Sequence, residues 1–296
     1  MDGVLVLNKP KGPTSAACVG MIRRKLGQKK IGHAGTLDPM AGGVLLILLG
    51  QATKIASHLL EQGEKIYGGT IEFGISTDTW DAEGRVLAEA DPGVVELRTL
   101  QEAIADMVGE SEQMVPPYSA AKHQGRPLYE LARKGLDAPV KTKTVKISRA
   151  ELEWFRPPLA RFRVACGSGT YIRSLAHSLG IRFGCGAMLK ELTREYSHPF
   201  GLDVAVDLDD LLANPELLPQ KTQSLCKALP GLPTLRLDKI QSAGVKNGNA
   251  LPVTALPPQD GAAALLLDQD GKELALAERR LEKGIEVWGI GRGLWN

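Results

Sequence analysis

The alternation of apolar and polar positions along the chain predicts a central sheet. Residues 4–7 and 44–49 are unbroken apolar runs, which are typical of short strands buried on both faces. Residues 65–74 alternate instead, so that Tyr67 and Phe73 fall on the same face of a strand. Further strands are expected at residues 145–154, 161–165 and 187–192.

Helices are expected between these strands. Thr14 or Ser15 can cap a helix that runs to about residue 26, where three basic residues suit the negative end of the helix dipole. Thr170, at the end of a glycine-rich segment, is a suitable N-cap for a helix that reaches about residue 179. Other helical segments are predicted at residues 51–61, 95–108, 128–134 and 207–212. This mixture of helices and strands does not contradict an α+β fold.

The pattern changes after about residue 200. Prolines interrupt residues 215–233, and short strands separated by Gly and Asp turns follow them. This succession is typical of a small β module. We therefore predict two domains, residues 1–230 and residues 231–296. The strands expected in the second domain are residues 263–267, 274–277 and 285–289.

Composition narrows the class of protein without changing this fold. With 296 residues, 43% of them hydrophobic and 24% charged, the chain has the balance of a globular protein. Its longest apolar run is far shorter than the roughly 20 residues that span a bilayer, and no signal-peptide pattern is present, so we expect a cytoplasmic protein with no membrane partner. The four cysteines and five histidines show no metal-ligand spacing, so no metal site is predicted.

The net charge of +2 conceals a strong segregation of charge. Residues 1–70 carry 9 Lys and Arg against 4 Asp and Glu, and residues 116–200 carry 15 against 6. Between them, residues 71–115 carry 2 basic residues against 11 acidic ones. Basic blocks that meet in space would form a surface able to bind nucleic acid. A mixed, solvated surface explains the same charges, so charge alone leaves both interpretations open.

The glycine-rich segment 32–43 has the most distinctive side chains. It contains His33 and Asp38 and leads directly into the apolar run that begins at Val44. Pro39 disfavours helical dihedral angles at Asp38, so the carboxylate is expected on an extended loop. A loop that ends on a buried strand is a common place for a functional site, although Asp-Pro also forms ordinary structural turns.

Five segments of the chain resemble motifs of one family. Residues 32–45, Gly-His-Ala-Gly-Thr-Leu-Asp-Pro-Met-Ala-Gly-Gly-Val-Leu, match every fixed position of the catalytic motif of the bacterial TruB family of tRNA pseudouridine synthases. Segments 4–12, 116–122, 169–175 and 189–194 resemble further family motifs in the same order. The resemblance covers essentially the whole chain. It implies a pseudouridine-synthase fold with a mixed, largely antiparallel central sheet, followed by a small PUA-like β domain.

The resemblance also implies a reaction. Family members convert the T-loop uridine of tRNA, position 55, to pseudouridine: the N1 glycosidic bond breaks, the base turns and a C5 glycosidic bond forms. No redox change or group donor is involved, so no cofactor is expected. Asp38 matches the essential catalytic aspartate of the family. A carboxylate can attack C6 of the base, attack C1′ of the ribose or remove the C2′ proton, and the sequence leaves these routes open.

Three further site residues are implied by the same resemblance. Arg173 matches the arginine that pairs with the catalytic aspartate, and its place in a first helical turn independently favours an anionic partner such as Asp38. Tyr67 matches the active-site tyrosine that stacks on the base. Leu192 resembles the apolar residue on the opposite side of the base. Ordinary core packing is the competing interpretation for Tyr67 and Leu192.

The substrate of the family implies residues that hold RNA. The target uridine is stacked inside the T-loop, so it must be flipped out before the reaction. His33 matches the family histidine that inserts into the vacated space. The PUA-like domain would contact the acceptor side of the tRNA, and a monomer is the family expectation. Candidate phosphate contacts, which position RNA without reading its bases, are Lys9, Lys11, Lys29, Lys30, Lys122 and Arg126.

Two other functions compete with this interpretation. A tRNA-folding chaperone would also use basic blocks and an inserted side chain, but it does not require Asp38, Tyr67 and Arg173 together. A synthase that additionally assists tRNA folding fits the same residues. A related synthase acting on another RNA also fits, because the motifs describe the chemistry more than the substrate.

Overall fold

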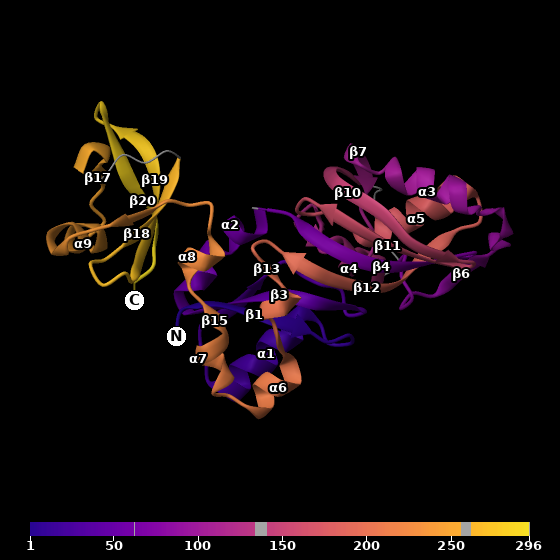
Figure 1. Ribbon diagram of the computed structural model, residues 1–296, viewed down its shortest axis with the longest axis horizontal. Helices are drawn as coiled ribbons and strands as arrows, with labels where there is room; N and C mark the ends of the chain where they lie inside the picture. The colour runs from indigo at the N-terminus through magenta and orange to yellow at the C-terminus, as the bar shows by residue number, and fades with distance from the viewer. Residues whose placement is uncertain (62, 134–140, 256–261, 296) are drawn as a thin grey trace.

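The polypeptide forms a long sheet flanked by helices, with a smaller second sheet at one end of the molecule (Figure 1). The computed structural model describes every residue except 62, 134–140, 256–261 and 296. The main strands of the long sheet are β1 (Gly3–Lys9), β3 (Ala41–Leu49), β4 (Lys65–Phe73), β7 (Gly109–Met114), β10 (Thr142–Arg156), β11 (Leu159–Cys166), β12 (Ala187–Ser197) and β14 (Val206–Asp207).

The order of the strands in space brings distant segments together. It is β14-β1-β3-β12-β4-β11-β10-β7, with β2 (Ile31–Ala34) paired to β3 at one side of this path. β1 and β14 are parallel, as are β3 and β12, and the other neighbours along the path are antiparallel. The predicted mixed, largely antiparallel sheet is confirmed.

The strands β1 and β3 are buried on both faces, as their continuous apolar runs predict. Leu5 and Ile47 belong to the core cluster on one face of the sheet, whereas Val4 and Leu46 belong to a second cluster on the other face. Every residue of β3 is buried. Because β3 leads directly out of the loop that carries Asp38, this loop ends on a rigid support.

Most helices lie around the long sheet, whereas α9 lies beside the C-terminal sheet (Figure 1). Of the two candidate caps of the first helix, Thr14 and Ser15, the structure uses Thr14, whose Oγ1 accepts a hydrogen bond from the Ala17 amide at 3.0 Å. The longest helices, α1 and α5, have 12 residues, so within the described part of the chain no helix could cross a bilayer. The helices are α1 (Ser15–Leu26), α2 (Ala56–Glu61), α3 (Leu97–Ala105), α4 (Leu128–Arg133), α5 (Ile172–Phe183), α6 (Leu208–Ala213), α7 (Leu217–Lys221), α8 (Leu225–Ala228) and α9 (Lys239–Lys246).

The structure corrects several predicted elements. The glycine-rich segment 32–43 begins as the strand β2, which pairs with β3. The helix expected over residues 51–61 is a 3₁₀ helix, η1 (Gly50–Ile55), followed by α2. Strand β7 was not predicted, since its sequence is polar and five of its six residues are exposed or half-buried. The expected end of α4 at residue 134 lies outside the described residues.

Thr170 is not the N-cap of α5. Its hydroxyl donates to the Gly167 carbonyl at 3.0 Å, and Tyr171 occupies the N-cap position without a capping side chain. Gln113, on β7, supplies the missing acceptor, because its Oε1 accepts a hydrogen bond from the Tyr171 amide at 2.7 Å. Arg173 still lies in the first turn of the helix.

The C-terminal residues form a separate sheet with the order β16-β18-β19-β20-β17 (Figure 1). The three strands predicted there are confirmed as β18, β19 and β20. The fully buried Trp288 belongs to a core cluster between this sheet and α9. The bounds are β16 (Thr234–Arg236), β17 (Leu251–Pro252), β18 (Ala263–Leu267), β19 (Glu273–Glu282) and β20 (Ile285–Gly293).

An apolar cluster connects the two sheets. Leu265 and Leu267 from β18 and Leu294 pack with Val4 and Leu48 of the long sheet in one buried cluster. Burial of shared apolar surface holds the C-terminal sheet against the rest of the chain. A domain boundary near residue 230 stays a prediction.

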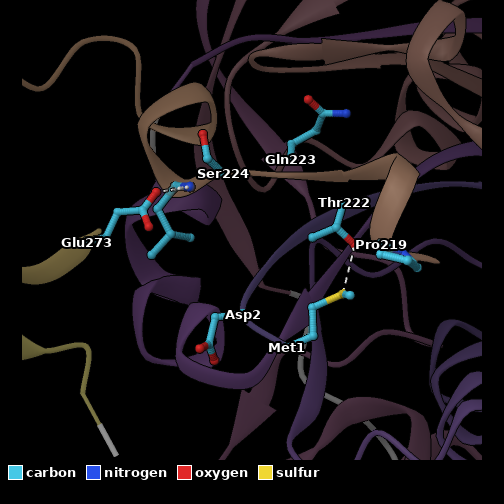
Figure 2. Close-up of a pocket in the computed structure, with 8 residues that line it drawn as sticks. Met1, Asp2, Pro219, Thr222, Gln223, Ser224 and Glu273 are labelled. Carbon is cyan, nitrogen blue, oxygen red and sulfur yellow. Dashed lines mark hydrogen bonds between the residues drawn. The ribbon is translucent and has the colours of Figure 1, made fainter. Parts of the chain in front are cut away.

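A cavity of about 240 Å³ lies beside this connection (Figure 2). In it, Glu273 accepts a hydrogen bond from the Leu225 amide at 3.1 Å, which ties β19 to the start of α8. Neither Asp38 nor Arg173 lines the cavity, so it is distinct from the site described below. Its lining residues are Met1, Asp2, Pro219, Thr222, Gln223, Ser224, Leu225 and Glu273.

Candidate active site

The loop that carries Asp38 is fixed by hydrogen bonds on both sides of the carboxylate. The Ser15 hydroxyl donates to the Leu37 carbonyl at 3.1 Å and accepts from the Leu37 amide at 2.9 Å. On the other side, the Gly12 amide donates to the Pro39 carbonyl at 2.8 Å. The Asp38 side chain is 35% exposed between these anchors. It is therefore held in place and open to solvent.

Lys9 is one of these anchors and not a surface cation. Its side chain is buried, and Nζ donates to the carbonyls of Pro10 at 2.8 Å, Pro13 at 2.8 Å and Pro39 at 3.3 Å. Burial lowers the pKa of the Lys9 ammonium. The prediction that Lys9 contacts phosphate is wrong for this structure, because all three donors of the ammonium are used inside the protein.

Arg173 meets Asp38, as the motifs predict. Its Nη2 donates to Asp38 Oδ1 at 3.1 Å, and its Nε lies 2.9 Å from Oδ2. Nη2 also donates to the Tyr118 carbonyl at 3.1 Å, and Nη1 donates to the Thr79 carbonyl at 2.9 Å. The guanidinium is almost completely buried. Its planar fork is thus fixed from several directions and faces the carboxylate with one edge.

A second carboxylate, Asp81, completes this group and was not predicted as a site residue. It is buried in the turn between β5 (Ile75–Thr77) and β6 (Val86–Glu89), with Oδ2 3.4 Å from Arg173 Nη1. Burial raises the pKa of Asp81, and a hydrogen bond from Thr79 Oγ1 at 2.6 Å partly opposes this. The segment Asp-Ala-Glu-Gly at residues 81–84 predicts only a hairpin turn, and the structure has a turn there, so nothing in the sequence marks the second role of Asp81.

Tyr67 and Leu192 lie on one face of the sheet beneath this loop. Tyr67 pairs with Arg194, and Leu192 pairs with Gly69 of the same strand, so their side chains share a face. Both belong to the main core cluster, with Tyr67 7% and Leu192 4% exposed. Burial raises the pKa of Tyr67, while the nearby Arg194 guanidinium opposes the rise. The Tyr67 hydroxyl is therefore protonated at neutral pH.

Arg194 is the other important residue that sequence reasoning missed. It is 1% exposed, and its Nε and Nη2 donate to the carbonyls of Val44 at 2.7 Å and Gly35 at 2.8 Å. These two carbonyls flank the Asp38 loop, so one guanidinium joins both ends of it. At Gly43, where φ is +100°, a Cβ would lie 2.2 Å from the Arg194 carbonyl, so only glycine allows this close pairing of β3 and β12.

The remaining predicted residues lie at or near the surface. His33, on β2, is half-buried, and its Nδ1 has no hydrogen-bond partner among the residues that the structure describes. Burial, assisted by the Arg194 charge, lowers the pKa of His33. Lys11 is exposed and lies 3.0 Å from Glu191. Lys122 is on β8 (Lys122–His123), and its side chain lies outside what the structure describes.

The site has the character of an acid–base centre without a metal cluster. In the described part of the chain, no group of three His, Cys, Asp or Glu residues could hold a metal ion. The groups present are an exposed carboxylate, a buried guanidinium and a tyrosine hydroxyl. A carboxylate held by a guanidinium can act as a nucleophile or a base, and a tyrosine hydroxyl can transfer a proton.

Comparison with proteins of known sequence gives the family. The model of the TruB family pseudouridylate synthase N-terminal domain matches residues 23–172. A relative named tRNA pseudouridine synthase B, from Nitratidesulfovibrio vulgaris strain Miyazaki F, is 57% identical and aligns over 99% of this chain and 97% of its own length. A relative of the same name from Syntrophotalea carbinolica is 40% identical over 94% and 92% of the two chains.

Solved structures show the same fold. An H/ACA RNP bound to a substrate RNA containing 2′-deoxyuridine aligns with a TM-score of 0.74 at 25% identity, over 99% of this chain and 85% of that chain. A Cbf5-Nop10-Gar1 complex gives the same TM-score at 26% identity and the same coverage. The pseudouridine-synthase fold with a C-terminal PUA-like domain is confirmed. The chain belongs to the TruB family of pseudouridylate synthases.

Proposed function

We propose that the protein isomerises the T-loop uridine at position 55 of tRNA to pseudouridine, with Asp38 as the catalytic carboxylate. The observation that carries the proposal is the ion pair between the buried Arg173 and the partly exposed Asp38. Leu37 and Ile172, their neighbours in the sequence, share one core cluster with Tyr67 and Leu192. The relatives named tRNA pseudouridine synthase B support tRNA as the substrate.

In this proposal Asp38 begins the reaction and Arg173 keeps the carboxylate oriented. The guanidinium contacts both carboxylate oxygens, which fixes the direction in which the carboxylate faces. The reaction breaks the bond between N1 and C1′ and forms a bond between C5 and C1′. C5 loses its proton and N1 gains one, so the isomerisation balances without a cofactor. Asp38 is released unchanged at the end.

Tyr67 and Leu192 hold the base while it turns. The flipped uracil stacks on the Tyr67 ring, with Leu192 on the other side. Because the Tyr67 hydroxyl is protonated at neutral pH, it can donate a proton to the base during the rearrangement. His33 inserts into the space that the base leaves in the T-loop, and its lowered pKa keeps the ring neutral for stacking.

The tRNA is held mainly through its backbone. Lys11 and Lys122 contact phosphates of the T-arm, and the C-terminal sheet contacts the acceptor side. The chain acts in this way as a monomer in the cytoplasm. Assistance with tRNA folding would use the same contacts without Asp38.

The test is tritium release from a T-arm hairpin labelled at C5 of the target uridine. Wild-type protein should release tritium, because C5 must lose its hydrogen, and Asp38→Asn should release none while binding the hairpin normally. Asp106→Asn is the matched control, since Asp106 is an exposed aspartate that pairs with Arg182 away from the site.

Three results would contradict parts of this proposal. Turnover by Asp38→Asn at the wild-type rate would remove Asp38 from the mechanism. Intact hairpin binding by wild type without any release would favour the folding function. Release from ribosomal RNA fragments and not from the hairpin would identify a different substrate.

A further inference from the structure

The turn that carries Asp81 contains an aromatic residue with an unusual backbone. Trp80 has φ of +64°, in the left-handed region that large side chains rarely adopt. Its neighbours both contact Arg173, through the Thr79 carbonyl and the Asp81 carboxylate. A left-handed backbone at a tryptophan costs free energy, so it persists only where surrounding contacts stabilise it. Trp80 has this backbone between the two residues that contact Arg173.

The Trp80 ring shows what stabilises this turn. It stacks on the imidazole of His177, with ring centroids 4.1 Å apart and the planes only 7° from parallel. His177 lies on α5 four residues after Arg173, which places both side chains on one side of the helix. The turn is therefore fastened to α5 at two points, one polar and one aromatic.

The backbone of Trp80 is held from the opposite side by β12. The Trp80 carbonyl accepts a hydrogen bond from the Leu189 amide at 3.0 Å, and the Ala82 amide donates to the Leu189 carbonyl at 3.1 Å. These bonds join the turn to the edge of β12, where Asp81 and Leu189 form an isolated parallel β-bridge. The stack on His177 adds a separate contact between the turn and α5.

We propose that Trp80 and His177 are positioning residues for the reaction of Asp38. Their stack holds the Thr79 carbonyl and Asp81 against Arg173, so that the guanidinium presents Nε and Nη2 to Asp38. Without the stack, the turn can move along the helix, and the orientation of Arg173 is no longer unique. In this role Trp80 acts through Arg173. This inference rests on the proposed function, since its readout is pseudouridine formation.

The test compares Trp80→Gly with Trp80→Phe in single-turnover tritium release, using excess protein and the labelled T-arm hairpin. Glycine suits the positive φ but removes the ring, so the rate should fall about tenfold to a hundredfold while hairpin binding is unchanged. Phenylalanine keeps an aromatic face and should retain most of the rate. Trp154→Gly is the matched control, because Trp154 is a partly buried tryptophan on β10 that packs beneath Arg156.

His177 allows a second, independent measurement. His177→Ala should lower the rate as Trp80→Gly does, and His177→Phe should restore it by stacking again. In the double variant Trp80→Gly with His177→Ala, the rate should fall little below that of either single variant, since both changes remove the same contact.

The outcomes separate this inference from the proposed function. If wild-type protein releases no tritium, the proposed function fails. If wild type is active and folded Trp80→Gly reacts at the wild-type rate, only the inference fails. Fully multiplicative losses in the double variant, or a weaker hairpin affinity with an unchanged rate, would also overturn the positioning role.

Discussion

Two buried arginines lie near the loop that carries Asp38, and their charges are satisfied in opposite ways. Arg173 faces the carboxylates of Asp38 and Asp81 and two carbonyls. Arg194 donates to the carbonyls of Gly35 and Val44, and among the described residues no Asp or Glu forms an ion pair with it. The first guanidinium is neutralised and the second is not.

The difference shows how the Asp38 loop can be held rigidly and still change its contacts when a substrate enters. An ion pair with a partly exposed carboxylate can be remade when a substrate enters, so Arg173 suits the chemistry. Carbonyls are neutral parts of the backbone and cannot leave, so Arg194 suits the architecture. Its unneutralised charge also acts on neighbours, because it works against the burial that raises the pKa of Tyr67 and adds to the burial that lowers the pKa of His33.

The largest effect is expected from the arginine that faces Asp38. Arg173→Lys replaces a fork that reaches four acceptor groups with a single ammonium, so the rate of tritium release should fall about 10²- to 10³-fold. Hairpin affinity should change little, because Arg173 is buried. Arg182→Lys is the control on the same helix, where an exposed pair with Asp106 is changed in the same way. A rate close to wild type for Arg173→Lys would show that Arg173 does not serve the reaction, so it would no longer differ from Arg194 in this respect.

The second effect concerns stability and the arginine that faces carbonyls. Arg194→Met removes the donor to the Val44 and Gly35 carbonyls, and the relief of a buried charge offsets only part of this cost. Urea unfolding should therefore show a loss of about 2–4 kcal/mol. Arg163→Met is the control, because Arg163 forms a partly exposed ion pair with Glu195 and should cost about 1 kcal/mol or less. Equal losses in the two variants would show that Arg194 does not bind the loop ends together.

The contrast also explains what the sequence could predict. Asp38 and Arg173 were paired correctly, because one lies in a distinctive loop motif and the other in the first turn of a helix that needs an anion. Strands β1 and β3 followed from continuous apolar runs, and the α1 cap followed from Thr14. These features depend on short stretches of chain.

The features that the sequence could not predict depend on how segments far apart in the sequence come together in space. Arg194 reaches the Asp38 loop only because β12 lies between β3 and β4, in register with Gly43 and Tyr67. The burial of Lys9 depends on three carbonyls gathered from two separate loops. No periodicity in a single segment carries information on these arrangements.

A smaller effect is expected from the hydroxyl that pins Leu37. Ser15→Ala removes both hydrogen bonds to the Leu37 backbone, next to Asp38, so the free energy of unfolding should fall by about 1–2 kcal/mol. The rate should fall with it, since the loop gains freedom beside the carboxylate. Ser178→Ala, at an exposed position of α5, is the control and should change neither quantity. An unchanged rate for Ser15→Ala would show that the other contacts of the loop fix it without this hydroxyl.

The smallest effect uses His33 as a probe of the charge on Arg194. In the folded protein the His33 pKa lies below its ordinary value, so the unfolded chain binds a proton more readily, and stability is lost as pH falls below about 6.5 through the folded pKa. In Arg194→Met, NMR titration of the His33 ring should give a higher pKa than in wild type, since one cause of the depression is gone. The loss of stability in mild acid should shrink accordingly.

Arg173→Lys should leave the His33 pKa where it is, because it keeps a positive charge paired with Asp38. Equal shifts of the His33 pKa in both variants would mean that Arg173 and Arg194 affect His33 alike. The distinction between Arg173 as the arginine of the reaction and Arg194 as the arginine of the architecture would then be wrong.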